Sequence, residues 1–209
     1  MAQSGTDEQG GAGRAARVHG AMAAAAPGIG ADIGMGAEAM RLRRYRALRR
    51  AVPAADALDQ APLAAVSGAV LAIGVLSGSP RLRRAGAEML GGLLVATAIK
   101  TAAKQVATRT RPSVVAETGS HDFTLSDEDD SDYQAFPSGH TAGAVAVTAP
   151  LMRAAPAAAV PLVPLVAGLL GLQLVRGAHY PSDIVAGGAV GVLASEVARR
   201  TAVRFLGEA

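Results

Sequence analysis

The stretch Phe136-Pro137-Ser138-Gly139-His140-Thr141 decides how the rest of this chain is interpreted. It stands where a polar segment ends and an apolar run begins. Proline fits the first turn of a helix, while serine and glycine supply a hydroxyl and unobstructed backbone N–H groups. Free N–H groups at a helix start, with the positive end of the helix dipole behind them, bind oxyanions such as phosphate. Because so short a motif is weak evidence alone, its meaning depends on its neighbours.

Two further polar blocks flank this stretch. Upstream, Lys104 is followed after six residues by Arg111-Pro112. Downstream stands the run from His179 to Asp183, with the sequence HYPSD. All three blocks lie at the ends of apolar segments, so folding can bring them together at one membrane face.

The composition indicates a single membrane domain. Half of the 209 residues are hydrophobic but only 3% are aromatic, so small and aliphatic side chains dominate. This composition suits close helix–helix approach in a bilayer. The absence of cysteine excludes disulfides and cysteine metal sites. The pI of about 9.8 is compatible with nucleic-acid binding, but the basic residues stand beside apolar runs, as the positive-inside rule describes. We therefore expect a bilayer and no nucleic acid as partner, and the oligomeric state stays open.

The chain divides into four regions. Residues 1–37 lack useful periodicity, and we expect them to be a disordered tail. Pro27 and Asp32 within this region, and Glu38 just after it, argue against a membrane span. Residues 38–56 include the basic run Met40–Ala51, which predicts an amphipathic helix on an anionic membrane surface. A solvated helix or a nucleic-acid arm is the alternative. Residues 57–200 form the membrane domain, and residues 201–209 a cytoplasmic tail.

Five apolar segments follow one another in the membrane domain. They are Ala61–Ser79, Ala85–Ala103, 137–152, Ala157–Val175 and the shorter Ile184–Val197. We predict an all-α integral membrane bundle of about five transmembrane helices plus a basic interfacial helix.

Arginines orient the predicted bundle. The Arg81–Arg84 turn, Arg153 and the C-terminal arginines fall on one side, which the positive-inside rule makes cytoplasmic. The three motif blocks then face the exterior, in a multi-pass protein of the cell membrane. Five spans would also place Met40–Ala51 outside. Either this segment lies on the outer surface, or a sixth span hides within Gly20–Met40.

The polar residues form a set suited to phosphoryl transfer. Lys104, Arg111, the Ser138 hydroxyl and the Gly139 N–H make an anion cradle, in which arginine offers a bidentate fork. His179 is the candidate nucleophile, because Asp183 four residues later can orient its ring. His140 is then the general acid that protonates the leaving oxygen. No metal-ligand set is evident, so we expect no metal and no cofactor.

The order Lys-six residues-Arg-Pro, then Pro-Ser-Gly-His, then Gly-x-His-Tyr-Pro-Ser-Asp resembles the type 2 phosphatidic acid phosphatase superfamily, whose core is shared with vanadium haloperoxidases. The resemblance spans roughly residues 61–197. It implies a metal-independent membrane lipid phosphatase with a phosphohistidine intermediate on His179, protonation by His140, and Asp183 paired with His179. It also implies phosphate contacts from Lys104, Arg111, Ser138 and Gly139.

One position departs from the family pattern. Gln173 stands six residues before His179, where the family has an arginine, and glutamine brings no charge. Arg176, about one helical turn on, is a candidate to reach the same pocket. If neither side chain serves, the protein is a catalytically impaired lipid-phosphate binder. A haloperoxidase and a nucleic-acid binder are further alternatives.

The substrate is not chosen by the sequence. Polyprenyl diphosphate, phosphatidate, phosphatidylglycerophosphate and prenyl-linked sugar phosphates are candidates by resemblance. Arg109 and His121 lie close to the motifs, and we expect neither to touch the substrate. The acidic run Ser126–Asp132 predicts a solvated loop more than a cation site, because no ligand spacing is evident.

Overall fold

The computed structural model describes residues 27–125 and 130–206, and nearly all regular structure in them is helical. The elements are, in chain order, α2 (Pro27–Arg41), η1 (Leu42–Arg44), α3 (Arg46–Ala51), η2 (Val52–Leu58), α4 (Gln60–Leu76), α5 (Pro80–Lys104), β1 (Thr108–Arg109), α6 (Pro112–Thr118), β2 (Phe123–Thr124), η3 (Ser131–Tyr133), α7 (Gly139–Ala154), η4 (Pro156–Ala158), α8 (Ala159–Arg176) and α9 (Pro181–Leu206). The two short strands pair antiparallel, with Thr108 opposite Thr124.

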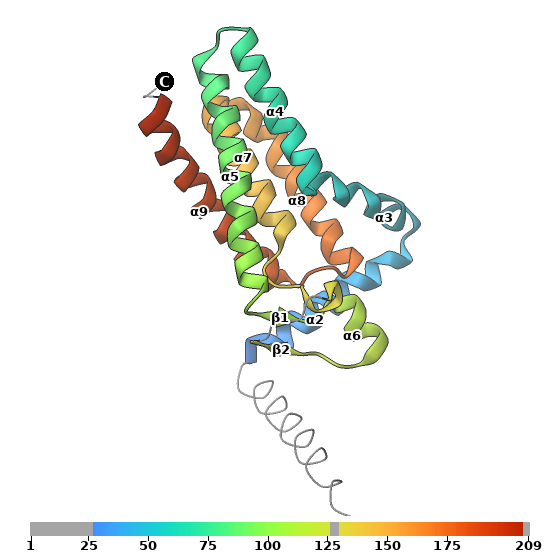
Figure 1. Cartoon of the computed structure of the whole chain (residues 1–209). Coiled ribbons are helices and arrows are strands. Elements are labelled where there is room, and N and C mark those ends of the chain that lie inside the picture. Colours follow the sequence, from blue (N-terminus) through green and yellow to red (C-terminus); the bar gives the residue numbers. More distant parts are fainter. Residues whose placement is uncertain (1–26, 126–129, 207–209) are drawn as a thin grey trace, which may run out of the picture.

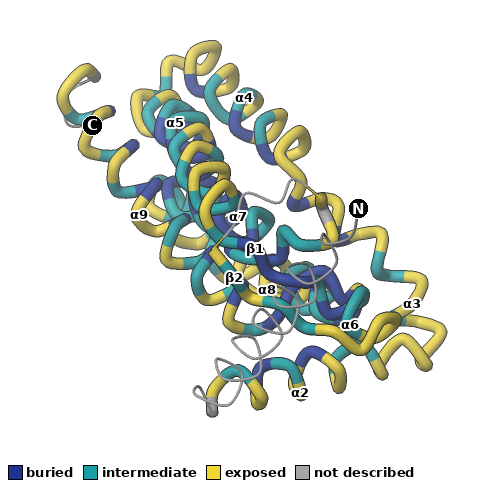
Figure 2. Tube along the Cα trace, turned by 60° about the horizontal axis from the view of Figure 1, so that its bottom comes forward, coloured by how far each residue is buried: buried dark blue, intermediate teal, exposed yellow. Residues whose placement is uncertain are grey.

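Helix α5 is the centre of the bundle, and α4, α7 and α9 pack around it (Figure 1). Small side chains make up one part of the core and larger aliphatic ones the other. The first cluster consists of Ala96, Ala142, Ala146 and Ala194, and the second of Leu63, Met89, Leu93 and Val147. Figure 2 shows buried positions along the inner side of these helices, whereas α3 has no buried residue.

Two glycines allow the close approach of α5 to its neighbours. A Cβ on Gly86 would lie 2.4 Å from the backbone nitrogen of Leu71, in α4. A Cβ on Gly92 would lie 3.1 Å from the carbonyl oxygen of Ala146, in α7. Larger residues at these positions would push the helices apart and open the core.

Helix α8 lies at the side of the bundle, mainly against η2 and α2. Val160, Val163 and Leu165 on it are all more than half exposed. Together with η4 it forms the one described helix, Pro156–Arg176, that is long and apolar enough to cross a membrane by itself. The pair Arg46–Leu58 and Gln60–Leu76, bent by 56°, would add a second span if it counts as one.

The five predicted spans correspond to α4, α5, α7, α8 and α9, so the positions of these helices are confirmed. Their crossing of a membrane remains a prediction, since only one or two meet the criterion of length and hydropathy. The last helix is longer than predicted. It continues to Leu206 through most of the expected tail at 201–209.

The N-terminal prediction was wrong where the structure can be compared with it. Residues 27–37, expected to be disordered, belong to α2, because Asp32 is buried in a network described below. The expected disorder of residues 1–26 lies outside the described residues. The single helix predicted over 38–56 is broken at Tyr45, whose backbone is extended (φ −79°, ψ 117°).

The basic segment has a structural partner in this fold. The Nε of Arg43 donates to the carbonyl of Val175 at 2.8 Å, and its Nη2 to the carbonyl of Arg176. These carbonyls belong to the last turn of α8, which lacks intrahelical donors. Arg43 therefore caps α8 and complements its dipole.

Candidate active site

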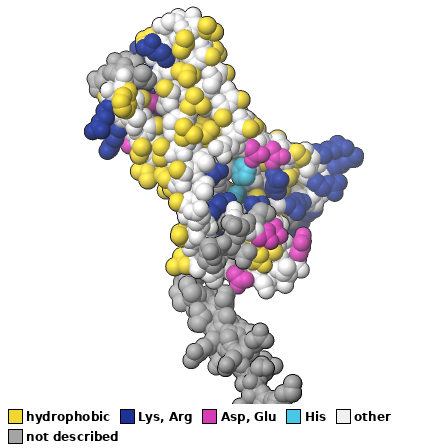
Figure 3. All heavy atoms as spheres, in the orientation of Figure 1, with side chains coloured by type: hydrophobic (Ala, Val, Ile, Leu, Met, Phe, Trp, Pro, Cys, Tyr) yellow, Lys and Arg dark blue, Asp and Glu magenta, His cyan; other side chains and the backbone are white. Residues whose placement is uncertain are grey.

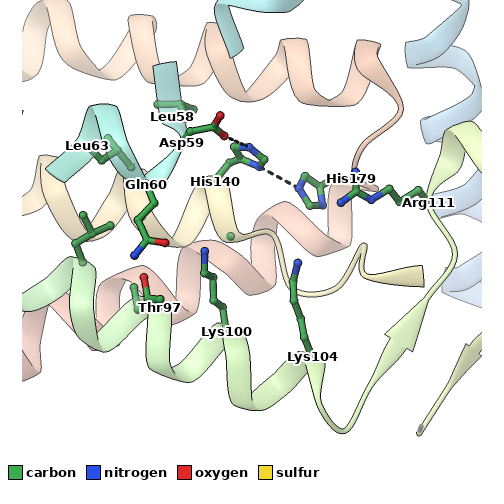
Figure 4. Close-up of a pocket in the computed structure, with 14 residues that line it drawn as sticks. Leu58, Asp59, Gln60, Leu63, Thr97, Lys100, Lys104, Arg111, His140 and His179 are labelled. Carbon is green, nitrogen blue, oxygen red and sulfur yellow. Dashed lines mark hydrogen bonds and ion pairs between the residues drawn. The ribbon is translucent and has the colours of Figure 1, made fainter. Parts of the chain in front are cut away.

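The ends of four helices meet at one end of the bundle: the start of α4, the end of α5, the start of α7 and the loop before α9. They enclose a cavity of about 100 Å³, shown in Figure 4. The ionisable side chains that line it are Asp59, Lys100, Lys104, Arg111, His140 and His179. The structure thus brings one or more residues of each predicted motif block to a single cavity.

Ser138 is the N-cap of α7 and is fully buried. Its Oγ accepts from the Thr141 N–H at 3.3 Å and from the Thr141 Oγ1 at 3.0 Å. The hydroxyl therefore serves the helix start and does not line the cavity, in contrast to the predicted phosphate contact. The N–H groups of Gly139 and His140 open the helix without intrahelical acceptors.

Helix α9 is held close to this turn. The Ser138 N–H donates to the carbonyl of Asp183 at 3.0 Å. A Cβ on Gly187 would lie only 2.4 Å from the carbonyl oxygen of Ser138, so a side chain there would separate the two segments. This contact fixes the spacing between the second and third motif blocks.

His179 is 2% exposed, and its hydrogen bonds define its tautomer. Its Nδ1–H donates to the carbonyl of Ala135 at 2.8 Å, because a carbonyl can only accept. The Nε2 lone pair is left facing the cavity, 3.3 Å from the Nδ1 of His140. Burial lowers the pKa of His179 to about 3, so the ring is neutral at physiological pH.

Asp183 does not orient His179, contrary to the prediction. Its Oδ1 accepts from the Nη1 of Arg109 at 2.7 Å, and its Oδ2 accepts from the Tyr180 N–H at 2.7 Å. The second bond is the reciprocal contact of a capping box at the start of α9. The Ala135 carbonyl takes the orienting role that the sequence assigned to Asp183.

Arg109 is the centre of a buried network that was not predicted. It is 3% exposed, and its Nη2 donates to Asp32 at 2.7 Å while Nη1 also reaches Ser182 at 2.7 Å. Asp32 in turn accepts from the Ser182 N–H at 3.0 Å. The guanidinium lies 4.0 Å from the centre of the Tyr180 ring. This network ties α2 to the start of α9, beside His179.

Lys100 and Lys104 lie one helical turn apart and line the same cavity from α5. Neither Nζ forms a hydrogen bond or an ion pair within the part of the chain that the structure describes. Across from them, the buried Nε of Arg111 has no partner among the described residues. Burial also lowers the pKa of Arg111. Lys100 was not predicted as a site residue, although its i, i+4 spacing from Lys104 is a signal in the sequence.

His140 is the second imidazole of the cavity. Its Nε2–H donates to the Oδ1 of Asp59 at 2.7 Å. Asp59 is the N-cap residue of α4, in a part of the chain where no site residue was predicted. A hydrogen bond from its Nδ1 to the Nε2 of His179 would place protons on both ring nitrogens, with the Asp59 carboxylate as the counter-charge.

Gln173 and Arg176, the two candidates to replace the arginine of the family's third motif, do not line the cavity. Gln173 is fully buried, with its Nε2 donating to the carbonyl of Ala55 at 3.3 Å and its Oε1 left without a partner among the described residues. Arg176 forms an ion pair with Asp56, in which both side chains are nearly half exposed. Its charge is still close enough to lower the pKa of Arg111.

His121, which was not expected to touch the substrate, does not line the cavity. His121 stacks edge-on against Tyr180 at 5.6 Å. Residues 126–129 of the acidic run are not described. Within residues 27–125 and 130–206 no group of three or more histidine or acidic side chains is placed to hold a metal ion.

The family model described as the PAP2 superfamily matches residues 85–205, which is more than half of the chain. The chain therefore belongs to this superfamily, as the motif order predicted, and its members are phosphatases that act on phosphate esters. No curated protein and no solved structure matches the chain. The matched region begins within α5, so α2, α3 and α4 contribute residues that the family model does not cover.

Proposed function

We propose that this protein is a metal-independent membrane phosphatase that hydrolyses a lipid phosphate or polyprenyl (di)phosphate through a phosphohistidine on His179. The observation that carries the proposal is the orientation of the His179 ring. Its Nδ1–H is held by a backbone carbonyl, and its Nε2 faces a cavity lined by three cations. A nitrogen lone pair next to unpaired cations suits attack on an anionic phosphorus.

In the first step the Nε2 of His179 forms a bond to phosphorus, and the bond from phosphorus to the leaving oxygen breaks. The proton on the Nδ1 of His140 passes to that oxygen. In the second step a water oxygen attacks the phosphohistidine, its proton goes to His140, and the N–P bond breaks to release phosphate. Lys104, Arg111 and the N–H groups at the start of α7 balance the charge of the transferred group.

The present contact between the two histidines bears on how substrate enters. At 3.3 Å, the Nε2 of His179 and the Nδ1 of His140 leave no room for a phosphoryl group between them. Substrate binding therefore has to separate these rings. Asp59 can hold the Nε2 of His140 meanwhile, so that the ring turns about that hydrogen bond.

A membrane location is supported by the distribution of side chains. Exposed apolar residues cover the outer faces of the bundle between two charged ends, as Figure 3 shows for one face. The arginines of the α4–α5 turn and of α9 lie at the end opposite the cavity. We propose that this arginine-rich end is cytoplasmic and that the cavity faces the exterior.

A second candidate function is binding of a lipid phosphate without turnover. It is favoured by Gln173, whose amide is engaged by Ala55 and brings no charge to the cavity. The two candidates differ in whether phosphate is released.

The test is phosphate release by the detergent-purified protein in the presence of a chelator, on a panel of lipid phosphates. We expect turnover in the wild type and none in His179→Ala. p-Nitrophenyl phosphate separates the roles of the two histidines, because its leaving group needs little protonation. His140→Ala should still form an acid-labile phosphoenzyme from this compound, whereas His179→Ala should form none. Lipid binding without turnover in the wild type would support the second candidate instead.

A further inference from the structure

The lining of the cavity changes from apolar to cationic along α5. Four successive levels of that helix line it: Leu93, then Ala96 and Thr97, then Lys100, then Lys104. At a rise of about 1.5 Å per residue, Leu93 and Lys104 stand roughly 16 Å apart along the axis. The cavity therefore has a cationic end and an apolar end, with a polar level between them (Figure 4).

The two lysines serve different parts of this gradient. Lys104 lies on the side of His179 and Arg111, where the transferred phosphoryl group would be. Lys100 lies below His140, beside Gln60 and Thr97. Its side chain also crosses Gly139, since a Cβ there would be 3.3 Å from the Lys100 Nζ. Because His140 marks the leaving oxygen, Lys100 is on the leaving-group side.

The charge of the lining exceeds what one phosphate needs. Three side-chain cations line the cavity against one carboxylate, Asp59, which is engaged by His140. A phosphate monoester carries a charge of about −1.5 to −2 at neutral pH. Lys104 and Arg111 are sufficient to balance it, so Lys100 would remain a half-buried cation whose nearby carboxylate, Asp59, is shared with His140. Such a group is costly unless a ligand supplies the missing charge.

The level beyond Lys100 is apolar. Leu58, Leu63 and Leu93 line it together with Ala96 and Gly143. A Cβ on Gly143 would be 2.9 Å from the Cδ1 of Leu63, so glycine keeps this end open. A molecule that follows the gradient presents, in order, a reacting phosphate, a second anionic group and a hydrocarbon chain.

On the basis of the function proposed above, we propose that the substrate class is the diphosphate of an apolar alcohol, with Lys100, Thr97 and Gln60 binding the phosphate that stays on the alcohol. His179 attacks the terminal phosphorus, and the bond from that phosphorus to the bridging oxygen breaks. The bridging oxygen leaves with the proton from His140, as part of an alkyl monophosphate. Water then releases the terminal phosphate from His179.

The experiment compares wild type and Lys100→Met on the monophosphate and the diphosphate of one prenyl alcohol, in detergent with chelator. The wild type should have the higher kcat/KM for the diphosphate. Loss of one charge-assisted contact of about 1.5–3 kcal/mol predicts a loss of roughly 10- to 100-fold for the diphosphate. Monophosphate turnover should fall less than diphosphate turnover, because only the diphosphate places a second anionic group beside Lys100. A melting curve of the variant in detergent shows separately that it is folded. Lys104→Met, the matched variant one turn away, should impair both substrates.

Other outcomes are equally informative. Equal losses on both substrates in Lys100→Met would place Lys100 with the transferred phosphate, in compensation for Gln173, and would overturn the diphosphate proposal. The diphosphate proposal would also be overturned if Lys100→Met lost no activity on either substrate, or if the wild type had the higher kcat/KM for the monophosphate. A wild type inactive on both compounds and on every lipid phosphate would instead overturn the function proposed above.

Discussion

The two ends of the bundle differ in whether their cationic side chains are paired with other groups of the protein. At the arginine-rich end, the buried Glu88 accepts from Arg84 and from Arg153, each at 2.9 Å, and Arg153 also reaches Ser195 at 3.0 Å. At the cavity end, Lys100 and Lys104 line an open space and donate to no described residue. Charges that are balanced by the protein stabilise its fold, whereas charges left unbalanced are available to a ligand. The arginine-rich end therefore contributes to stability, whereas the cavity end has cations left for the ligand that we propose.

Removing a cavity cation should have the largest effect on activity. In Lys104→Met we expect phosphate release to fall by about 10²–10³-fold, because one electrostatic contact to the transferred group is lost. Thermal stability in detergent should stay equal or rise, since a partly buried charge is removed. A parallel fall in stability would mean that Lys104 is a structural group, and the comparison would fail.

The opposite pattern is expected for Glu88→Gln. Loss of the carboxylate leaves Arg84 and Arg153 near a neutral group, which should cost about 3 kcal/mol of unfolding free energy. Chemical denaturation in detergent measures this difference. The kcat of the remaining folded protein should match the wild type, because the cavity is at the other end. Ser195→Ala is the milder control, since it removes a single neutral acceptor of Arg153.

Asp59→Asn sharpens the assignment of His140. The amide can still accept from the His140 Nε2–H, but it no longer favours the charged ring. We expect kcat on alkyl phosphates to fall by roughly tenfold, with the alkaline limb of the pH–rate profile moving to lower pH. Turnover of p-nitrophenyl phosphate should change less. An unmoved alkaline limb would show that Asp59 does not act through His140.

The smallest effect concerns stability against pH. Burial holds the pKa of His179 at about 3 in the folded protein, against an ordinary value of 6.5. The unfolded state therefore binds the proton first, and stability falls as pH decreases from 6.5 towards 3. Between pH 6.5 and 5.5 this amounts to about 1 kcal/mol. Burial lowers the pKa of His121 as well. Melting curves of His179→Asn and His121→Asn, compared with wild type at both pH values, separate the two contributions, and an unchanged slope in His179→Asn would contradict this one.

The sequence predicted those features that depend on local rules. The helix start at Ser138 followed from the Pro-Ser-Gly turn, and the five apolar runs gave the five principal helices. The convergence of the motif blocks followed from their places at helix ends. These inferences use propensity and hydrophobic pattern, which act over a few residues.

What could not be predicted depends on contacts between distant segments. Asp32 and Arg109 are 77 residues apart, and no local pattern marks them as partners. Asp59 meets His140 only because α4 docks on α7. The predicted pairing of Asp183 with His179 was wrong. Spacing along a chain shows which residues can meet, but not which of several possible hydrogen bonds forms. Asp183 accepts from Arg109, and His179 donates to the Ala135 carbonyl instead.

The buried contact of Asp32 with Arg109 and Ser182 has a practical consequence for anyone who would trim or transplant this domain. The segment that the family model matches begins at residue 85, yet α2 holds the start of α9 through Asp32, and both α2 and η2 pack on α8. A fragment cut at the family boundary would expose the Arg109 guanidinium and the inner face of α5. Designs that borrow this candidate site should therefore include α2.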